Sequence, residues 1–378
     1  MKKIIVLFLS IYAQFAFAQN SEMSLVFIGD VMQHMPQIDA AYDSSSKTYN
    51  YDSCFVYVKP ILQNADVAIA NLEITLAGKP YSGYPQFSAP DALARGLKNA
   101  GINYLVTANN HSCDRGKSGI IRTIKVLDSL GIEHTGTFVD SLEREKKNVL
   151  LIEKNGIRVA IINYTYGTNG IPIPKPTVVN IIEKEKITND VTKAKALRPD
   201  KIILVVHWGN EYERVPNAFQ KDIAKFCFEQ GADIVIGSHP HVLQQFEYTQ
   251  RIDTLDDMKV KENIVVYSLG NYVSNQRDRY KDGGAMVKIV LQKNLLGQTK
   301  IKEQGYFLTW VNKAFVNGKN QYYILPASQF ENTVGKLDAT ALEKLKLFTE
   351  DSRSLFKEHN KSFTEYKFDF VKNEWRLE

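Results

Sequence analysis

The fold of this chain is decided by one stretch, which reads Ile234-Val235-Ile236-Gly237-Ser238-His239-Pro240-His241. A short run of β-branched residues ends at a glycine and is followed by two histidines one residue apart. The length and composition of the run predict a buried strand, with both histidines on the loop at its carboxyl end. Open α/β sheets bind ligands at this edge, and neutral imidazole is the commonest metal ligand. The stretch therefore indicates a metal site; two histidines on a surface loop are the simple alternative.

Other predicted strands end in the same kind of polar cluster. The residues that follow six strand ends are Asp30, Glu73, Asn110 with His111, His207, His239 with His241, and Asn271. Five of the seven histidines lie in these segments, the fifth being His34. Histidines placed without a shared role would be scattered like His134 and His359. The gathering of histidines favours a functional site.

The order of the predicted elements indicates a mixed α/β fold. Apolar runs at 25–28, 66–70 and 104–106 alternate with helical patterns, and Asn155-Gly156 predicts a hairpin between 149–152 and 158–162. Further strands are expected at 202–206 and 264–267, and a last helix at 339–356. This order fits a sandwich of two sheets flanked by helices. The length of 378 residues accommodates one large domain or two smaller ones.

The amino terminus has the organisation of a secretory signal peptide. Lys2 and Lys3 precede an apolar run at 4–11, and Ala16-Phe17-Ala18 offers a small-residue cleavage site. We expect residues 1–18 to be a signal peptide and the mature chain to be exported; an uncleaved amino-terminal anchor is the alternative. Acidic and basic residues are interspersed, so nucleic-acid binding is not expected. Three cysteines cannot all pair internally, so no disulfide framework is expected.

The candidate ligands suit borderline divalent cations. Two carboxylates, an amide oxygen and three imidazoles fit Mn²⁺, Zn²⁺ or Fe²⁺. Two such ions about 4 Å apart can share a hydroxide and clamp a phosphoryl group. A histidine beside a ligand can protonate the leaving oxygen, and His111 beside Asn110 has this position. Structural alternatives are a helix cap for Asp30, a buried ion pair for Glu73, and loop hydrogen bonding for Asp114 and Ser268, which we prefer for the last two.

Six short motifs occur in one order along the chain. They are Gly29-Asp30, Asn71-Leu72-Glu73, Ala108-Asn109-Asn110-His111-x-x-Asp114-x-Gly116, His207-Trp208-Gly209-x-Glu211-Tyr212, Gly237-Ser238-His239-Pro240-His241-Val242 and Ser268-Leu269-Gly270-Asn271. Over residues 25–290 they resemble the poly-γ-glutamate capsule biosynthesis protein family (the CapA family), a branch of the calcineurin-like metallophosphoesterases. The resemblance implies a four-layer α/β/β/α sandwich of two mixed sheets with a two-metal site at the strand ends.

The resemblance also implies roles for individual residues. The metal ligands it implies are Asp30, Glu73, Asn110, His207, His239 and His241, with Glu73 standing where the superfamily has a bridging aspartate. His111 corresponds to the general acid, whereas Glu211 and Asn271 are candidate contacts to the ligands or to substrate. The superfamily's Asp-x-His motif is changed, because Met32 stands at the histidine position and His34 is displaced by two residues. This departure predicts that the first of the two metals is weakly held.

Two functions of different class follow. The favoured one is an exported metal-dependent hydrolase of the phosphoesterase type, acting on an anionic polymer or phosphorylated precursor in the cell envelope of a bacterium. The residues do not distinguish a phosphoester from an amide as the bond attacked. The alternative is a non-catalytic envelope component that binds an anionic polymer or supports a membrane synthase complex. We expect the metallophosphoesterase-like domain to span residues 19–330, and a carboxyl-terminal helical extension to span 331–378.

Overall fold

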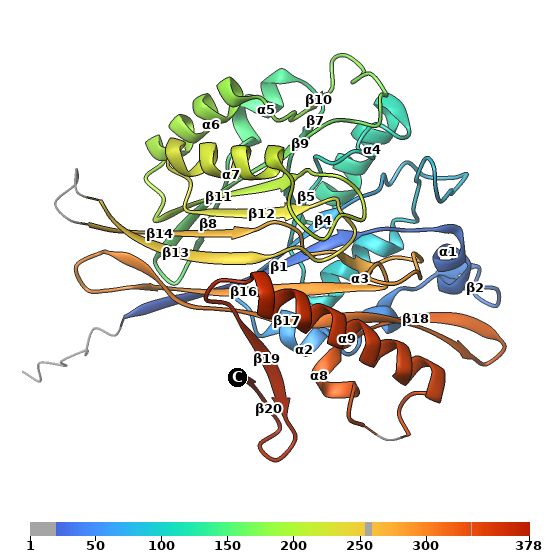
Figure 1. Ribbon diagram of the computed structural model, residues 1–378. Helices are drawn as coiled ribbons and strands as arrows, with labels where there is room; N and C mark the ends of the chain where they lie inside the picture. Colours follow the sequence, from blue (N-terminus) through green and yellow to red (C-terminus); the bar gives the residue numbers. More distant parts are fainter. Residues whose placement is uncertain (1–19, 254–258, 334) are drawn as a thin grey trace, which may run out of the picture.

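The computed structural model describes residues 20–253, 259–333 and 335–378, so the expected signal peptide lies outside the described residues. Two large mixed sheets lie face to face at the centre of the molecule (Figure 1). The order of the main strands in the larger sheet is β20-β19-β17-β16-β1-β4-β5-β6, with β15 paired to β1 and β18 to β17. Its strands are β1 (Ser21–Val31), β4 (Val67–Leu72), β5 (Tyr104–Val106), β6 (Glu133–Thr135), β15 (Asn271–Val273), β16 (Gly283–Lys293), β17 (Thr299–Val316), β18 (Lys319–Pro326), β19 (Thr364–Asp369) and β20 (Glu374–Leu377).

The smaller sheet has six strands in the order β13-β14-β12-β11-β9-β8. They are β8 (Leu150–Lys154), β9 (Ile157–Thr165), β11 (Lys201–His207), β12 (Ile234–Ser238), β13 (Phe246–Asp253) and β14 (Lys259–Val266). The predicted hairpin is present as β8 and β9, which pair antiparallel. The strands β9, β11, β12 and β14 run parallel, so their carboxyl ends meet at one edge of the sheet.

Helices cover the outer face of each sheet (Figure 1). The helices are α1 (Met35–Ala41), α2 (Lys59–Gln63), α3 (Ala92–Ala100), α4 (Gly116–Ser129), α5 (Ser141–Lys147), α6 (Lys184–Ala196), α7 (Ala218–Gln230), α8 (Ala327–Phe330), α9 (Ala339–His359) and the 3₁₀ turn η1 (Asp52–Phe55). Short strands β2 (Tyr42–Asp43) and β3 (Thr48–Tyr49) form one ribbon, and β7 (Thr137–Phe138) and β10 (Val178–Val179) another. The expected mixed α/β sandwich of two sheets is confirmed.

The layers follow from alternation of side chains along buried strands. On β1, Leu25 and Phe27 enter the core between the sheets, whereas Val26 and Ile28 pack with the helix-side core that contains Leu97 of α3. Successive side chains of a strand point to opposite faces, so a strand buried on both faces is apolar throughout. Each fully buried aliphatic side chain stabilises the fold by about 1.5–3 kcal/mol. This explains the uninterrupted apolar runs in the sequence.

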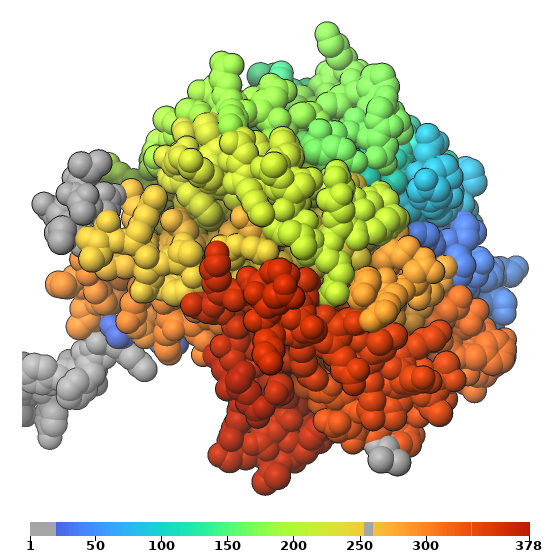
Figure 2. Space-filling model, viewed as in Figure 1, coloured from blue at the N-terminus to red at the C-terminus, as the bar shows by residue number. Residues whose placement is uncertain are grey.

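The carboxyl-terminal residues are joined to the larger sheet. Strand β19 pairs parallel with β17, and β20 pairs antiparallel with β19. Helix α9 places Leu345 and Phe348 in the core between the sheets. In the space-filling view the segment forms a continuous red surface beside the orange β17–β18 region (Figure 2). The segment 331–378 therefore contains two strands besides the expected helix, and the domain boundary at 331 stays a prediction.

Candidate metal centre

The first half of the centre lies at the carboxyl end of β1. Asp30 is paired in register with Asn71 of β4 and Asn271 of β15, so three polar side chains share one edge. Gly29 permits this close approach, because a Cβ atom there would lie 2.1 Å from the Gly270 carbonyl oxygen. Glu73 follows β4 directly and is fully buried. The larger sheet thus presents two buried carboxylates at its carboxyl edge.

The second half comes from the smaller sheet. His207 is the last residue of β11, and His239 and His241 follow β12. Both of these latter histidines adopt positive φ, 102° at His239 and 57° at His241, a backbone region that non-glycine residues seldom occupy. Such strained residues cluster at functional sites, where the surrounding structure holds them in place. The opening stretch therefore ends as predicted, with both imidazoles at the strand edge.

The two halves meet through short contacts between carboxylate, amide and imidazole groups. Glu73 Oε1 lies 3.4 Å from His207 Nε2 and 3.7 Å from His241 Nε2. His241 Nδ1 lies 3.2 Å from Asp30 Oδ2 and 3.1 Å from Asn271 Oδ1, so a proton on Nδ1 leaves Nε2 as an acceptor. Outer carboxylate partners of this kind orient metal-binding histidines.

Asn110 joins the same cluster. Its Oδ1 lies 2.9 Å from His207 Nε2, and its amide nitrogen donates to Asn169 Oδ1 at 3.2 Å. The structure thus brings together all six residues expected as ligands, and each is at most 3% exposed. Their roles as ligands stay a prediction.

The donor set fits a divalent metal. Two groups of side chains hold ligand atoms within 4.8 Å of one another, and Glu73 belongs to both: one comprises Glu73, His239 and His241, the other Asp30, Glu73 and His207. Neither oxygen of Glu73 has a hydrogen-bond partner, nor does His239 Nδ1. A buried charged group without a partner is costly. A cation between these atoms would satisfy all three.

The pKa shifts of the clustered residues also favour metal binding. Burial raises the pKa of Glu73 well above its ordinary value, and the nearby Asp30 carboxylate adds to the effect. Burial also lowers the pKa of His239 to about 3 and that of His207 well below its ordinary value. Burial opposes ionisation of Asp30, but the His241 contact outweighs it, and the pKa of Asp30 lies well below its ordinary value. Neutral imidazole is the form of histidine that binds a metal, and a bound cation would offset the charge of the Glu73 carboxylate.

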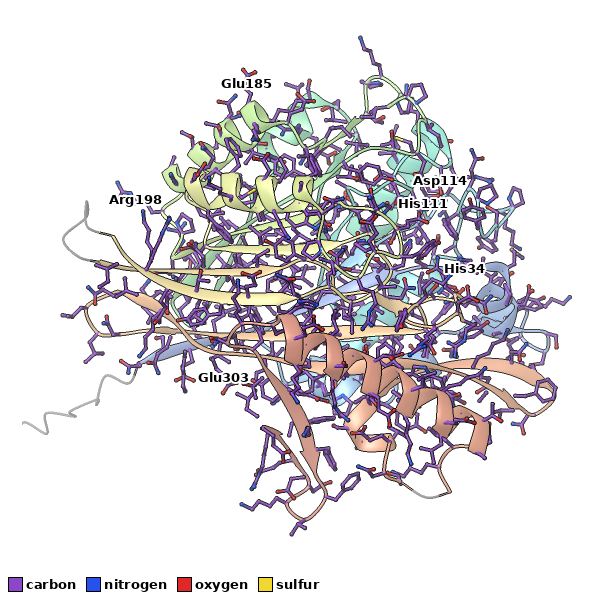
Figure 3. The ribbon with its side chains drawn as sticks, viewed as in Figure 1. His34, His111, Asp114, Glu185, Arg198 and Glu303 are labelled. Carbon is purple, nitrogen blue, oxygen red and sulfur yellow. The ribbon has the colours of Figure 1, made fainter. Side chains whose placement is uncertain are left out.

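His111 lies beside the cluster and is held by a carboxylate that we expected to have only a loop role. Its Nδ1 lies 2.8 Å from Asp114 Oδ2, and the same oxygen accepts the Phe87 backbone N–H at 2.7 Å. The two residues are labelled close together in Figure 3. The loop hydrogen bond expected of Asp114 is present at Phe87, and the same carboxylate also orients His111. The i, i+3 spacing of the two residues was the available signal.

An open cavity of about 290 Å³ adjoins His111 and His241. The other residues in its wall are Met32, His34, Tyr84, Glu211, Tyr212 and Gln276. Glu211 therefore borders the cavity beside the centre, and its contact with substrate stays a prediction. Met32 is buried at the cavity wall, and His34 is turned toward Gln37 and Phe87 instead of the ligands.

The loop after β9 also reaches the centre. The Tyr166 ring lies 4.6 Å from the His239 ring, and Asn169 accepts the Asn110 amide. Neither residue belongs to a motif that the sequence marked as a candidate site. Ser268 hydrogen-bonds to the Val242 carbonyl oxygen, the loop role preferred for it.

The protein is a two-sheet α/β sandwich with a buried carboxylate–imidazole cluster at its strand ends. Residues 24–276 match the family model described as Bacterial capsule synthesis protein PGA_cap, and the chain belongs to this family. Within the described ranges, no helix combines the length and apolar character needed to cross a membrane.

Two curated relatives support the assignment. The chain is 28% identical over 289 residues to the capsule biosynthesis protein CapA of Bacillus anthracis, covering 73% of this chain and 66% of that protein. It is 27% identical over 286 residues to the PGA biosynthesis protein CapA of Bacillus subtilis (strain 168), covering 74% of this chain and 70% of the relative. The chain thus spans about two thirds of the length of these relatives.

Solved structures similar to the chain include a phosphoesterase and a nucleotidase. The calcineurin-like phosphoesterase YfkN from Bacillus subtilis has a TM-score of 0.47 at 14% identity, covering 90% of this chain and 99% of that chain. The NAD nucleotidase of Haemophilus influenzae has a TM-score of 0.48 at 15% identity, covering 93% of this chain and 65% of that chain.

Proposed function

We propose that this chain is an exported metal-dependent hydrolase of the phosphoesterase type. Its substrate would be an anionic cell-envelope polymer or a phosphorylated precursor of one. The observation that carries the proposal is the Glu73 carboxylate, which is fully buried, lacks a hydrogen-bond partner and belongs to two overlapping ligand groups. A structural carboxylate would be paired, whereas a metal-bridging carboxylate is satisfied only by its ions.

The proposed centre holds two divalent ions, with Mn²⁺, Zn²⁺ and Fe²⁺ as the candidates. The residues that would hold them are Asp30, Glu73, Asn110, His207, His239 and His241. Bound ions of this class activate water and neutralise the charge of a phosphoryl group. Side chains of the protein itself carry out the remaining chemical steps.

His111 is the proposed general acid. The Asp114 carboxylate accepts from Nδ1, which fixes the imidazole orientation. Nε2 then carries the proton that the leaving oxygen takes up. Phe87 supports the arrangement from two sides, since its backbone N–H donates to Asp114 and its ring lies 4.6 Å from that of His111.

Membership of the capsule synthesis family supports a role in making a capsule polymer. One relative is named a PGA biosynthesis protein, which favours a poly-γ-glutamate-like polymer as the context. Export, the polymer and any synthase complex that the chain joins are parts of this proposal. The expected signal peptide and the interspersed surface charge are compatible with an envelope location.

A non-catalytic envelope component remains a second candidate, and Met32 is the observation that favours it. A thioether stands where the superfamily has an imidazole, and a soft thioether is poorly matched to a hard cation such as Mn²⁺. The buried Met32 side chain fills the wall of the cavity that a substrate would enter.

The test is the metal content of the purified chain, measured with hydrolysis of p-nitrophenyl phosphate and bis-p-nitrophenyl phosphate in added Mn²⁺ or Zn²⁺. We expect bound metal that approaches two equivalents only when metal is added in excess, and turnover that a chelator abolishes. The His239→Ala variant should lose both. A chain that binds no metal and hydrolyses neither ester would contradict the proposal and favour the non-catalytic candidate.

A further inference from the structure

A second cavity, of about 270 Å³, lies apart from the metal centre between α1, η1 and β18. Helix α1 lies beside the end of β18 (Figure 1). The wall of this cavity is rich in uncharged polar side chains, among them Gln33, Gln37, Asn50, Tyr51, Gln321 and Tyr322. Neither the family assignment nor the proposed hydrolysis uses these residues.

Two polar atoms in this wall lack hydrogen-bond partners. Gln33 is 1% exposed and uses its amide nitrogen on the Met32 carbonyl, but its Oε1 is unpaired. Tyr51 is 5% exposed, and its hydroxyl has no partner. Buried polar groups are nearly always hydrogen-bonded, so a pair of unsatisfied atoms at one cavity indicates that a ligand completes them.

The chemistry of the wall excludes an anionic ligand. Its charged residues are Asp43, Asp52 and Lys319, a formal excess of one negative charge. The Lys319 ammonium also donates to the Tyr42 carbonyl. A hydroxyl group can donate to Gln33 Oε1 and accept from the Tyr51 hydroxyl, and amide and phenol side chains around it supply further partners of both kinds.

We propose that this cavity binds a neutral saccharide unit. Polar groups at fixed positions orient its hydroxyls, and the buried Tyr51 and Tyr322 provide apolar ring surface. The site differs from the metal centre in ligand class, because it has no convergent carboxylate–imidazole cluster and would take an uncharged polyol. Its existence does not depend on the proposed hydrolysis.

The segment 32–37 connects the two cavities. Met32 and His34 lie in the wall of the metal-centre cavity, and Gln33 and Gln37 in the wall of the second one. Gln37 accepts the His34 backbone N–H at 2.9 Å and lies 3.2 Å from His34 Nδ1. A saccharide held by Gln33 and Gln37 therefore contacts the same short segment that borders the metal centre.

The test is binding of N-acetylglucosamine and glucose, with glucuronate as the anionic probe, to the metal-free chain by titration calorimetry. We expect a neutral sugar to bind and glucuronate to bind at least about ten-fold more weakly. Tyr51→Phe should weaken neutral-sugar binding about three- to ten-fold, the usual size of one lost hydrogen bond. The variant removes only an unpartnered hydroxyl, so it should fold normally.

The matched control is Tyr272→Phe, which also removes a buried, unpartnered hydroxyl but lies outside the cavity wall. A second readout is the thiol of Cys54 in the wall, which the sugar should protect from alkylation relative to Cys113 and Cys227. Failure of both neutral sugars to bind, or preference for glucuronate, would overturn the proposal. Binding that Tyr51→Phe leaves unchanged and that does not protect Cys54 would also overturn it. Metal-dependent hydrolysis could still hold in each case.

Discussion

Glu73 and His207 face each other at 3.4 Å although their strands belong to different sheets. Glu73 follows β4 of the larger sheet, and His207 ends β11 of the smaller one. The contact exists because the carboxyl ends of both sets of strands open on the same side of the sandwich. The proposed centre is therefore an interface between two sheets, and its geometry depends on how the sheets pack.

Replacing Glu73 by Gln separates metal binding from folding. The variant removes a buried, unpartnered carboxylate, so the free energy of unfolding of the metal-free chain should change by less than about 1 kcal/mol. The rise in melting temperature on adding Mn²⁺ should disappear, because a ligand stabilises only the state that binds it. Calorimetric scans with and without metal give both quantities.

The control for this prediction is Glu262→Gln. That buried carboxylate is paired with Lys201 at 3.5 Å, so its loss should destabilise the chain while leaving the response to metal intact. A large destabilisation by Glu73→Gln in metal-free buffer would show that Glu73 is a structural residue.

The His111–Asp114 pair predicts a dependence on the leaving group. His111→Asn should reduce kcat for phenyl phosphate by about 10²–10⁴-fold, and the reduction should be smaller for p-nitrophenyl phosphate, whose leaving group needs less protonation. Asp114→Asn should also reduce kcat more for phenyl phosphate than for p-nitrophenyl phosphate, and both reductions should be smaller than in His111→Asn. Steady-state kinetics on both esters measure these reductions in kcat.

His134→Asn is the control, since His134 also pairs with an aspartate, Asp128, outside the site. Equal losses on both esters would argue against proton donation.

Met32 predicts a gain of metal binding. Met32→His restores an imidazole beside Asp30 and should raise the bound metal toward two equivalents at a fixed metal concentration. Elemental analysis of dialysed protein is the measurement. Met35→His is the matched control, because Met35 is nearby in sequence but 42% exposed. An unchanged stoichiometry in Met32→His would show that the first metal does not depend on this position.

We predict that a side chain larger than hydrogen does not fit at Gly237 of β12. A Cβ atom there would lie 2.1 Å from the Tyr267 carbonyl oxygen and 2.5 Å from Trp208 Nε1, and Trp208 Nε1 donates a hydrogen bond to that oxygen. Gly237→Ala should lower the free energy of unfolding by about 1–3 kcal/mol, the usual cost of overpacking. Gly167→Ala, where the added Cβ meets open space, should change it little. Urea unfolding of both variants measures the difference.

His134 predicts a pH dependence of stability. Burial lowers the pKa of His134 below 6.5, against the opposing effect of Asp128. Between the two pKa values the unfolded chain binds more protons, so stability rises with pH there. This contribution is complete above pH 6.5 and is lost as pH falls through the folded-state pKa. Urea unfolding at about pH 7.5 and about pH 5.5 should show a smaller loss on acidification in His134→Asn than in the unaltered chain. Equal losses of stability in the two chains would contradict the prediction.

Much of the fold was predictable from local sequence. Buried strands such as β5 and β11 were expected because a strand covered on both faces must be apolar throughout. The hairpin of β8 and β9 followed from its Asn155-Gly156 turn. Strands β13, β19 and β20 were not predicted. Their side chains alternate with solvent-facing positions or lie at a sheet edge, where the apolar signal is weak.

The sequence by itself determined which residue types stand at the strand ends, because ligand chemistry depends on side-chain identity and is visible in the motifs. Only the tertiary structure decided their relations. It paired Glu73 with His207 across the two sheets, and it left Gln33 Oε1 and the Tyr51 hydroxyl without hydrogen-bond partners at one cavity. These relations join residues far apart in the chain, and they arise from the packing of two sheets, which no local pattern encodes.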